Sequence, residues 1–371
     1  MHVAKLLLVA LVVSSLVVLG LFSRREYVVP ADQIGDFTAV ELPLVFAGSH
    51  QRLVYVSVPV QGVSLRLMVD TGHFAPLSIN SDVLDCLDVE LTARRLHRDM
   101  RGNTYVVREF VLPTLSLGTL DLSNVPGVEN VTSPPGFDGT IGLGLLRHFN
   151  LLFDYRGERL TLFRKDRHPE ELTENGWYRC PYGLSSCFGV AVDGIDEGYE
   201  IGLDSGSSHT TVDADSRLGR ALRTSLGEDA RYQVVDDTGE TLFVYPNVRF
   251  LLGGEFDLGP STCVVMELDP PTGDGLMGYD FFWNNAVFVD YGAGEMWLRP
   301  AESSESPSPA AKCRTPTRCS TPCELPGISS LRHARNKPLP GGSFMTFLLE
   351  NSSSNPKAKP MKFEGIRGTQ T

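Results

Sequence analysis

The sequence MVDTG at residues 68–72 returns as GLDSG at residues 202–206, and this pair of matches decides the fold. A second pair lies downstream, where DGTIG at residues 138–142 is matched by DGLMG at residues 274–278. The members of the first pair are 134 positions apart and those of the second pair are 136 apart, so only about two residues are inserted between the pairs. This order and spacing indicate that the chain contains two copies of one structural unit.

Weaker matches support the repeat. Phe153-Asp154-Tyr155 answers to Val289-Asp290-Tyr291 at the same spacing of 136, and Gly102 pairs with Gly239 between the blocks. The aspartates that precede a glycine or end a strand in these blocks have a structural explanation, because a carboxylate at such a position caps a turn. We therefore expect Asp138, Asp274, Asp154 and Asp290 to cap turns.

The residues before each Asp-Thr/Ser-Gly motif alternate between apolar and polar, as half-buried strands do. The apolar positions are Val63, Leu65, Leu67 and Val69 in the first unit and Tyr199, Ile201 and Leu203 in the second. The same period continues around turns at residues 101–103 and 236–239, so each unit contains a hairpin. The sequence predicts an all-β chain of two tandem β-barrel lobes, closed or nearly closed, related by a pseudo-twofold axis.

Helical periodicity is weak in both units. Residues 81–95 and 213–226 are the only stretches that favour a helix, and each follows its acidic motif.

The motifs place one carboxylate per unit at the end of an apolar strand. If the units pack about a pseudo-twofold axis, Asp70 and Asp204 meet at the interface, where two like charges share one proton. The ionised carboxylate can then activate a water while the protonated one polarises a scissile carbonyl, which requires neither metal nor cofactor.

The residues that follow each aspartate would support this arrangement. Gly72 and Gly206 permit a tight loop, and Thr71 and Ser205 can hydrogen-bond across the axis. We include Ser207, the small residue after the second motif, in the same supporting loop.

These features resemble the retropepsin and pepsin group of aspartic peptidases. Ile141-Gly142 and Met277-Gly278, each followed by an apolar turn, are similar to the family's second conserved block. The likeness covers about residues 54–299, and each lobe is nearer in size to a retroviral half-enzyme than to a lobe of pepsin. The resemblance implies an aspartic endopeptidase built as a fused pseudo-dimer, with a substrate cleft between the lobes and flaps near Gly102 and Gly239.

One residue departs from the family pattern. The position after the glycine is usually small, and Ser207 obeys, but His73 does not. A titratable ring beside the pair could block a hydrogen bond to Asp70 or shift the shared proton. The alternative is therefore a catalytically inactive peptide-binding or scaffolding module of the same fold.

The N-terminal segment predicts a membrane helix. Residues 6–22 are almost entirely apolar and Arg24-Arg25 follows, with no small-x-small cleavage site before it. This favours an uncleaved signal anchor over a removed signal peptide. We expect the catalytic region on the periplasmic or extracellular side of the membrane, or secreted if the segment is cleaved.

Five regions follow from these patterns. The tail is assigned as disordered because Ser, Pro, Thr, Lys and Gly dominate it and no apolar period survives there. The regions are an anchor or signal peptide at 1–23, a linker at 24–39, a first lobe at 40–168, a second lobe at 169–300 and the tail at 301–371.

The net charge of −12 argues against a nucleic-acid partner, which would require neutralised phosphates. The expected partners are a peptide or protein substrate and the membrane. A homodimer of single lobes is unnecessary, because both motifs lie in one chain, and we expect a monomer acting as an internal pseudo-dimer.

The seven cysteines leave several possibilities open. Cys180 and Cys187 are close enough to bridge a short loop, whereas Cys86 and Cys263 stand alone and could be buried thiols. A zinc site is disfavoured because no paired C-x2-C spacing occurs, and we predict no metal. The residues of that alternative are Cys313, Cys319, Cys323 and His333.

Other catalytic motifs are missing from the sequence. No Walker loop, HExxH pair or G-x-S-x-G elbow occurs. His209 lies too close in sequence to Ser205 and Asp204 to form a serine triad with them.

Overall fold

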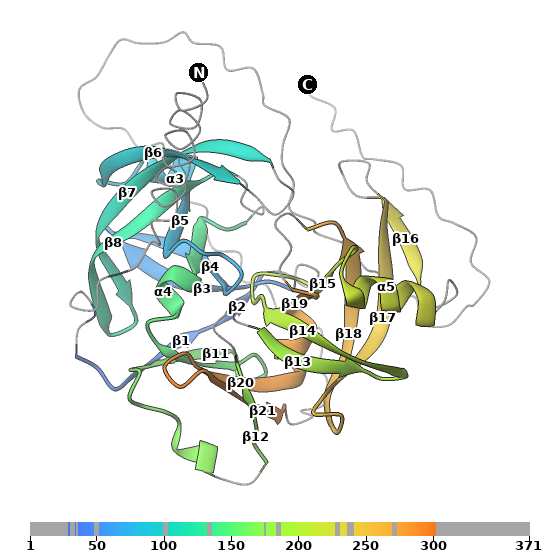
Figure 1. The fold of residues 1–371 in the computed structure, drawn as a ribbon. Coiled ribbons are helices and arrows are strands. Elements are labelled where there is room, and N and C mark those ends of the chain that lie inside the picture. The colour runs from blue at the N-terminus through green and yellow to red at the C-terminus, as the bar shows by residue number, and fades with distance from the viewer. Residues whose placement is uncertain are drawn as a thin grey trace, which may run out of the picture.

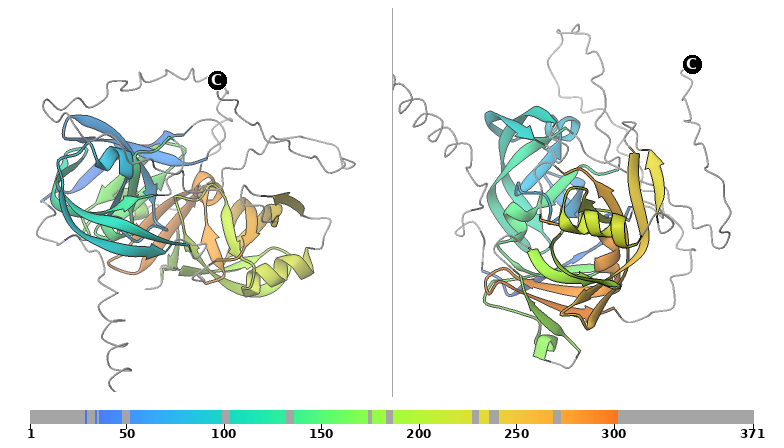
Figure 2. Two further views of the ribbon diagram at one scale, coloured as in Figure 1. Left: turned by 90° about the horizontal axis from the view of Figure 1, so that it is seen from above. Right: turned by 45° about the vertical axis from the view of Figure 1, so that its right-hand side comes forward.

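The computed structural model has two β lobes joined by a third sheet (Figure 1). It describes residues 29, 34, 36–47, 52–98, 103–131, 136–173, 176–182, 187–226, 231–235, 241–268 and 273–301. The predicted all-β, two-lobed architecture is confirmed. Figure 2 shows the first lobe, in blue and green, beside the second, in yellow and orange, from two further directions.

The first lobe is an eight-stranded sheet. Its strand Val54–Val60 alternates buried apolar and exposed residues because one face covers the lobe's interior, whereas its strand Gly139–Gly142 is buried along its whole length. In spatial order the strands are β2 (Val45–Phe46), β3 (Val54–Val60), β4 (Val63–Asp70), β9 (Gly139–Gly142), β5 (Leu77–Asn80), β8 (Leu120–Asn130), β7 (Thr104–Leu117) and β6 (Glu90–Arg98).

The second lobe repeats this order in a seven-stranded sheet, without an equivalent of β2 in the described part. Every strand of the first lobe except β2 has an equivalent at the same place in the second lobe. This confirms that the sequence repeat is a structural repeat. In the same spatial order the strands are β13 (Cys187–Val192), β14 (Ile195–Leu203), β19 (Gly275–Met277), β15 (Thr210–Asp213), β18 (Phe256–Met266), β17 (Thr241–Leu252) and β16 (Tyr232–Val235).

A six-stranded sheet ties the lobes together, below them in the view of Figure 1. Its two central strands pair antiparallel. Leu152 lies opposite Phe288, which is the residue at the same position in the second copy of the repeat. The pseudo-twofold axis therefore passes between these residues. In spatial order the strands are β1 (Ala39–Pro43), β11 (Arg159–Phe163), β10 (Asn150–Asp154), β20 (Asn285–Asp290), β21 (Glu295–Pro300) and β12 (Tyr178–Pro181).

The described helices are short. They are α3 (Ser81–Leu84), α4 (Leu143–Leu146), α5 (Arg217–Ser225), α6 (Tyr279–Asn284) and the 3-10 turn η2 (Glu170–Thr173). The helix expected within residues 213–226 is confirmed as α5, which Ser216 caps by accepting a hydrogen bond from the Gly219 N–H at 3.0 Å.

The helix expected over residues 81–95 is wrong beyond Leu84. Strand β6 begins at Glu90 and pairs with β7 from Glu90↔Val111 to Arg98↔Thr104. The weak local preference for helix is overridden by the backbone hydrogen bonds that β7 supplies.

A single cluster of buried apolar side chains runs through both lobes and the joining sheet. Among its largest fully buried members are Phe153, Tyr155 and Phe282. Phe282 stacks on Tyr155 with a centroid separation of 5.3 Å, so aromatic packing continues from one lobe into the other.

The repeated aspartates bond to backbone N–H groups. Asp154 accepts from Gly157 at 2.8 Å and Asp290 from Gly292 at 2.9 Å, which confirms both as turn caps. Asp138 and Asp274 differ from the expected turn caps, because the N–H groups that they bind belong to strands: Arg66 on β4 donates to Asp138 at 2.8 Å and Glu200 on β14 donates to Asp274 at 2.9 Å. They hold the two motif-bearing strands in equivalent ways.

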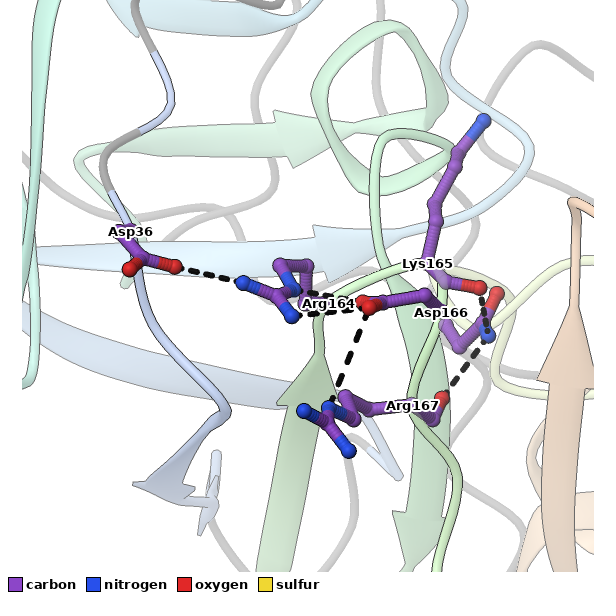
Figure 3. Close-up of polar contacts among 6 residues, drawn as sticks. Asp36, Arg164, Lys165, Asp166 and Arg167 are labelled. Atoms are coloured by element: carbon purple, nitrogen blue, oxygen red, sulfur yellow. Dashed lines mark hydrogen bonds and ion pairs between the residues drawn. The ribbon is translucent and has the colours of Figure 1, made fainter.

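The N-terminal end of the described body is fastened to the first lobe. Asp36 accepts a hydrogen bond from the Arg164 guanidinium at 2.6 Å (Figure 3). The Arg164 N–H also donates to the Thr38 carbonyl at 3.1 Å. Arg164 also pairs with Asp166, while the Asn150 amide donates to carbonyls of the same loop. The chain preceding β1 therefore enters beside the loop that follows β11.

No helix among the described residues is long and apolar enough to cross a membrane. The predicted anchor at residues 6–22 lies outside the described residues, as does the tail from residue 302 onward.

Cys180 is a buried free thiol, which contradicts the possible bridge to Cys187. Its strand β12 runs antiparallel to β21 and buries the sulfur against the joining sheet, so the thiol is held within the core rather than presented to the following loop. Cys263 is also a buried free thiol, whereas Cys86 is exposed.

Candidate active site

Strands β4 and β14 carry the two motif aspartates to the interface between the lobes. Each strand pairs in parallel with a short strand of its own lobe, β9 and β19 respectively. Asp70 lies opposite Gly142, and the Asp204 N–H donates to the Met277 carbonyl at 2.9 Å. Each buried strand therefore ends at or directly before its predicted catalytic aspartate.

Four hydrogen bonds cross between the two motif loops. The Thr71 N–H donates to Ser205 Oγ at 3.1 Å, and the Ser205 N–H donates to Thr71 Oγ1 at 3.0 Å. The hydroxyls then donate onward, Thr71 to the Leu203 carbonyl at 3.0 Å and Ser205 to the Val69 carbonyl at 2.9 Å. Because both side chains are buried, this reciprocal network replaces the hydrogen bonds that water would make.

Each carboxylate rests on the glycine of the opposite loop. A Cβ atom added to Gly72 would lie 2.8 Å from Asp204 Cγ, and one added to Gly206 would lie 2.3 Å from Asp70 Cγ. Each glycine also donates its N–H to the aspartate of its own loop, Gly72 to Asp70 at 2.8 Å and Gly206 to Asp204 at 3.0 Å. The site therefore needs glycine at both positions for the carboxylates to approach each other.

The surroundings of the carboxyl pair favour a proton on Asp204. Burial raises the pKa of Asp204 well above its usual value, and the charge of Asp70 and a hydrogen bond to Asp70 raise it further. The N–H groups of Gly206 and Ser207 oppose this rise without cancelling it. A proton held on Asp204 beside Asp70 can act as an acid while the other carboxyl acts as a base.

Tyr155 contacts the loop of the second motif and was not predicted as a site residue from the sequence. Its hydroxyl donates to the Ser205 carbonyl at 3.5 Å, and burial raises its pKa well above the usual value, with added effects from Tyr279, Asp204 and Asp70. Its place in the repeated block at residues 153–155 is a sequence signal that could have drawn attention to it.

The two residues after the glycines differ. Ser207 Oγ donates to the His209 carbonyl at 2.7 Å, so the side chain serves the loop of its own lobe. The His73 ring packs on Gly142, where an added Cβ would lie 2.8 Å from His73 Cδ2. The two copies of the loop are therefore asymmetric at this position.

The predicted flap glycines, Gly102 and Gly239, lie outside the described residues. The strands on either side of them are described, and both pairs are antiparallel: β6 with β7 and β16 with β17. Each lobe thus has a hairpin at the predicted position.

Within the described ranges, no group of three or more His, Cys, Asp or Glu side chains could hold a metal ion. The cysteines and histidine of the alternative zinc site lie in the tail, beyond the described part of the chain.

No sequence profile of a known protein family matches the chain, and no curated protein matches it in sequence. Solved structures do resemble it. The aspartic proteinase from Irpex lacteus superposes with a TM-score of 0.50 and 13% identity, over 72% of this chain and 99% of that one. The basic 7S globulin from soybean gives a TM-score of 0.44 and 11% identity, over 71% of this chain and 95% of that one.

The architecture is therefore an aspartic-proteinase-like fold with two lobes. The likeness to the Irpex lacteus enzyme shows this fold. The chemistry has to be argued from the residues that the fold brings together.

Proposed function

We propose that the chain is an aspartic endopeptidase in which Asp70 and Asp204 share one proton. The proposal rests on the close packing of each carboxylate against the glycine of the other lobe's loop, together with the raised pKa of Asp204. Two carboxyl groups held this way form an acid and a base at one point. One chain carries both motifs, and each lobe is nearer in size to a retroviral half-enzyme than to a lobe of pepsin. Both features support a retropepsin-like pseudo-dimer fused into one chain.

In the proposed reaction, a water molecule lies between the carboxyl groups. The ionised carboxylate takes a proton from the water as its oxygen attacks the scissile carbonyl carbon, and the protonated carboxyl donates to the carbonyl oxygen. The tetrahedral intermediate collapses when the carboxyl group that took the proton of the water passes it to the amide nitrogen, the other carboxylate takes a proton from a hydroxyl of the intermediate, and the C–N bond breaks. The Thr71 and Ser205 network would keep both carboxyl groups in position throughout.

The test is cleavage of a mixed peptide library by the purified full-length protein between about pH 3 and pH 8. Asp70→Asn and Asp204→Asn should each reduce kcat/KM by about 100-fold to 10,000-fold, the usual scale for removing an acid–base group. Asp88→Asn, at an exposed position after α3, is the matched control and should cleave like the parent. Equal cleavage by all four proteins would refute the assignment.

A peptide-binding module without catalysis is the second candidate. The observation in its favour is the His73 ring, which occupies the position where the second loop has the small Ser207. If the well-folded parent cleaves no peptide, measurable equilibrium binding of peptides from the same library to the protein would support this candidate.

We also propose that the two lobes are exported and tethered by the apolar segment at residues 6–22, with each polypeptide acting as a monomer. Protease protection of spheroplasts or vesicles, with carbonate extraction, tests the tether and the side of the membrane. Sedimentation of the detergent-solubilised protein tests the monomer, since one chain supplies both aspartates.

A further inference from the structure

The His73 side chain is a buried titratable group that the proposed reaction does not use. It follows the loop glycine on which Asp204 rests, and its ring packs on Gly142, the residue paired with Asp70. The Nε2 atom is buried and makes no hydrogen bond to any described residue. A buried ring nitrogen without a partner favours the neutral imidazole, because a charged ring there would lack solvation.

Two groups in the described structure exert charge effects on this ring. Asp70, at the end of β4, favours the imidazolium, and His97, on β6, disfavours it. The His97 ring centroid is 6.5 Å from that of His73. Gly142 of β9 packs on the ring, and the Leu143 N–H of α4 donates to the His73 carbonyl at 2.6 Å; β9 and α4 bear no charged side chain.

Burial has the largest effect on the His73 equilibrium. It lowers the pKa of the imidazole below its usual value, and Asp70 only partly opposes it. The ring is therefore neutral near neutral pH and becomes charged as the solution is acidified.

We propose that His73 is a positioning residue for the proton of the Asp70–Asp204 pair. The neutral imidazole leaves that proton on the pair, and the imidazolium beside Asp70 opposes the uptake of a second proton, so that one carboxyl group stays ionised and can still act as the base. This inference rests on the proposed peptidase function and adds a regulation of the same site.

The consequence is an acid limit to activity set by His73. As pH falls, His73 takes a proton from solvent, and the favourable charge next to Asp70 lowers the proton affinity of the pair. Activity therefore persists at a pH where a carboxyl pair lacking such a neighbour would already hold two protons. The enzyme's optimum is accordingly more acidic than that of its His73-free variants.

The first experiment measures the coupling without using activity. NMR titration of the full-length protein with labelled histidine follows the His73 imidazole, identified by the signal lost in His73→Gln. The pKa of His73 should lie below its usual value and fall further in Asp70→Asn, because the stabilising carboxylate is gone. An unchanged titration in Asp70→Asn would overturn the proposal.

The second experiment is the pH profile of kcat/KM for the parent, His73→Gln and His73→Ser. Both variants should move the acid limb to higher pH, so that one unit below the parent's acid midpoint they retain about tenfold less of their maximum than the parent does. His168→Gln, at an exposed position, is the matched control and should keep the parent's profile. Superimposable acid limbs in parent and His73 variants would also overturn the proposal.

The two experiments separate failure of the inference from failure of the proposed function. A parent that cleaves no peptide at any pH refutes the peptidase, while the titration still decides whether His73 and Asp70 are coupled. A cleaving parent with an uncoupled His73 retains the peptidase and refutes the inference.

Discussion

Thr71 and Ser205 hydrogen-bond to each other's backbone across the interface between the lobes, although they are 134 positions apart in the chain. Each hydroxyl accepts from the partner's N–H and donates to a carbonyl of the partner's strand, so neither hydroxyl has a proton left to donate to substrate. These contacts fix the relative position of the two loops that carry Asp70 and Asp204.

Removal of either hydroxyl should weaken this link. We expect Thr71→Val and Ser205→Ala each to lower the free energy of unfolding by about 1–3 kcal/mol, because each leaves a buried N–H and a carbonyl without a partner. The double variant should lose less than the two single losses combined, since both remove the same network. Chemical denaturation measures these values.

Thr114→Val, at an exposed position on β7, is the control for the hydroxyl-to-methyl change and should shift stability by less than about 0.5 kcal/mol. Strict additivity of Thr71→Val and Ser205→Ala would contradict a shared network.

A side chain at Gly206 should displace Asp70. The added Cβ of Gly206→Ala would lie 2.3 Å from Asp70 Cγ, so we expect a loss of about 1–3 kcal/mol of stability and loss of peptide cleavage. Gly198→Ala on β14 is the matched control, because its Cβ meets nothing within 4 Å. Thermal unfolding and cleavage assays on both variants check this, and equal behaviour would exclude the close approach.

The raised pKa of Asp204 predicts a particular pH dependence of stability. The folded state holds this proton to higher pH than the unfolded state does, so its stabilising effect is complete below the unfolded pKa of about 4 and is lost as pH rises through the folded value. Asp204→Asn should therefore remove a decline in the free energy of unfolding that the parent shows above about pH 4.

Urea denaturation of the parent and Asp204→Asn across a pH series provides the measurement. The difference between the two proteins isolates Asp204 from other titrating groups, with Asp88→Asn as the control for substitution at an exposed site. A constant difference across the whole series would be inconsistent with a raised pKa.

Arg52, which precedes β3 of the first lobe, reaches α6 of the second. Its guanidinium lies 2.8 Å from an Asp280 oxygen and 5.6 Å from the Tyr279 ring centroid. Because the Asp280 side chain is only 15% exposed and burial raises its pKa, Arg52→Ala leaves a poorly solvated carboxylate. We expect a loss of about 1–2 kcal/mol at neutral pH, reduced from the buried-pair value because Arg52 is 34% exposed.

That loss should shrink on acidification, when Asp280 becomes neutral in the variant, and Asp280→Asn should abolish most of it. A double-mutant cycle by chemical denaturation measures the coupling. If Arg52→Ala costs the same with and without the Asp280 carboxylate, the pair does not hold the lobes together.

Local pattern predicted much of the fold. The alternation of Leu65, Leu67 and Val69 corresponds to buried positions on β4, and the repeat spacing corresponds to equivalent strands of two lobes. Alternation works because side chains on successive strand residues point to opposite faces. The same reasoning failed at residues 90–95, where the partner strand β7, not the local sequence, decides the conformation.

The sheet that joins the lobes, the Tyr155 contact and the Arg52–Asp280 pair were not predicted. Each involves segments from distant parts of the chain: β10 with β20, Tyr155 with Ser205, and Arg52 with α6. No periodicity within a segment encodes such a contact, because it depends on how two finished lobes dock.

The sequence by itself determined that the chain contains two copies of one β unit and that each copy ends an apolar strand in an acidic loop. Only the tertiary structure decided that Asp70 and Asp204 lie against the opposite loop's glycine, and that His73 is buried without a hydrogen-bond partner for Nε2. The reason is that strand and turn preferences act over a few residues, whereas the proton affinity of these groups depends on charges and solvent exclusion contributed by the other lobe and by neighbouring strands.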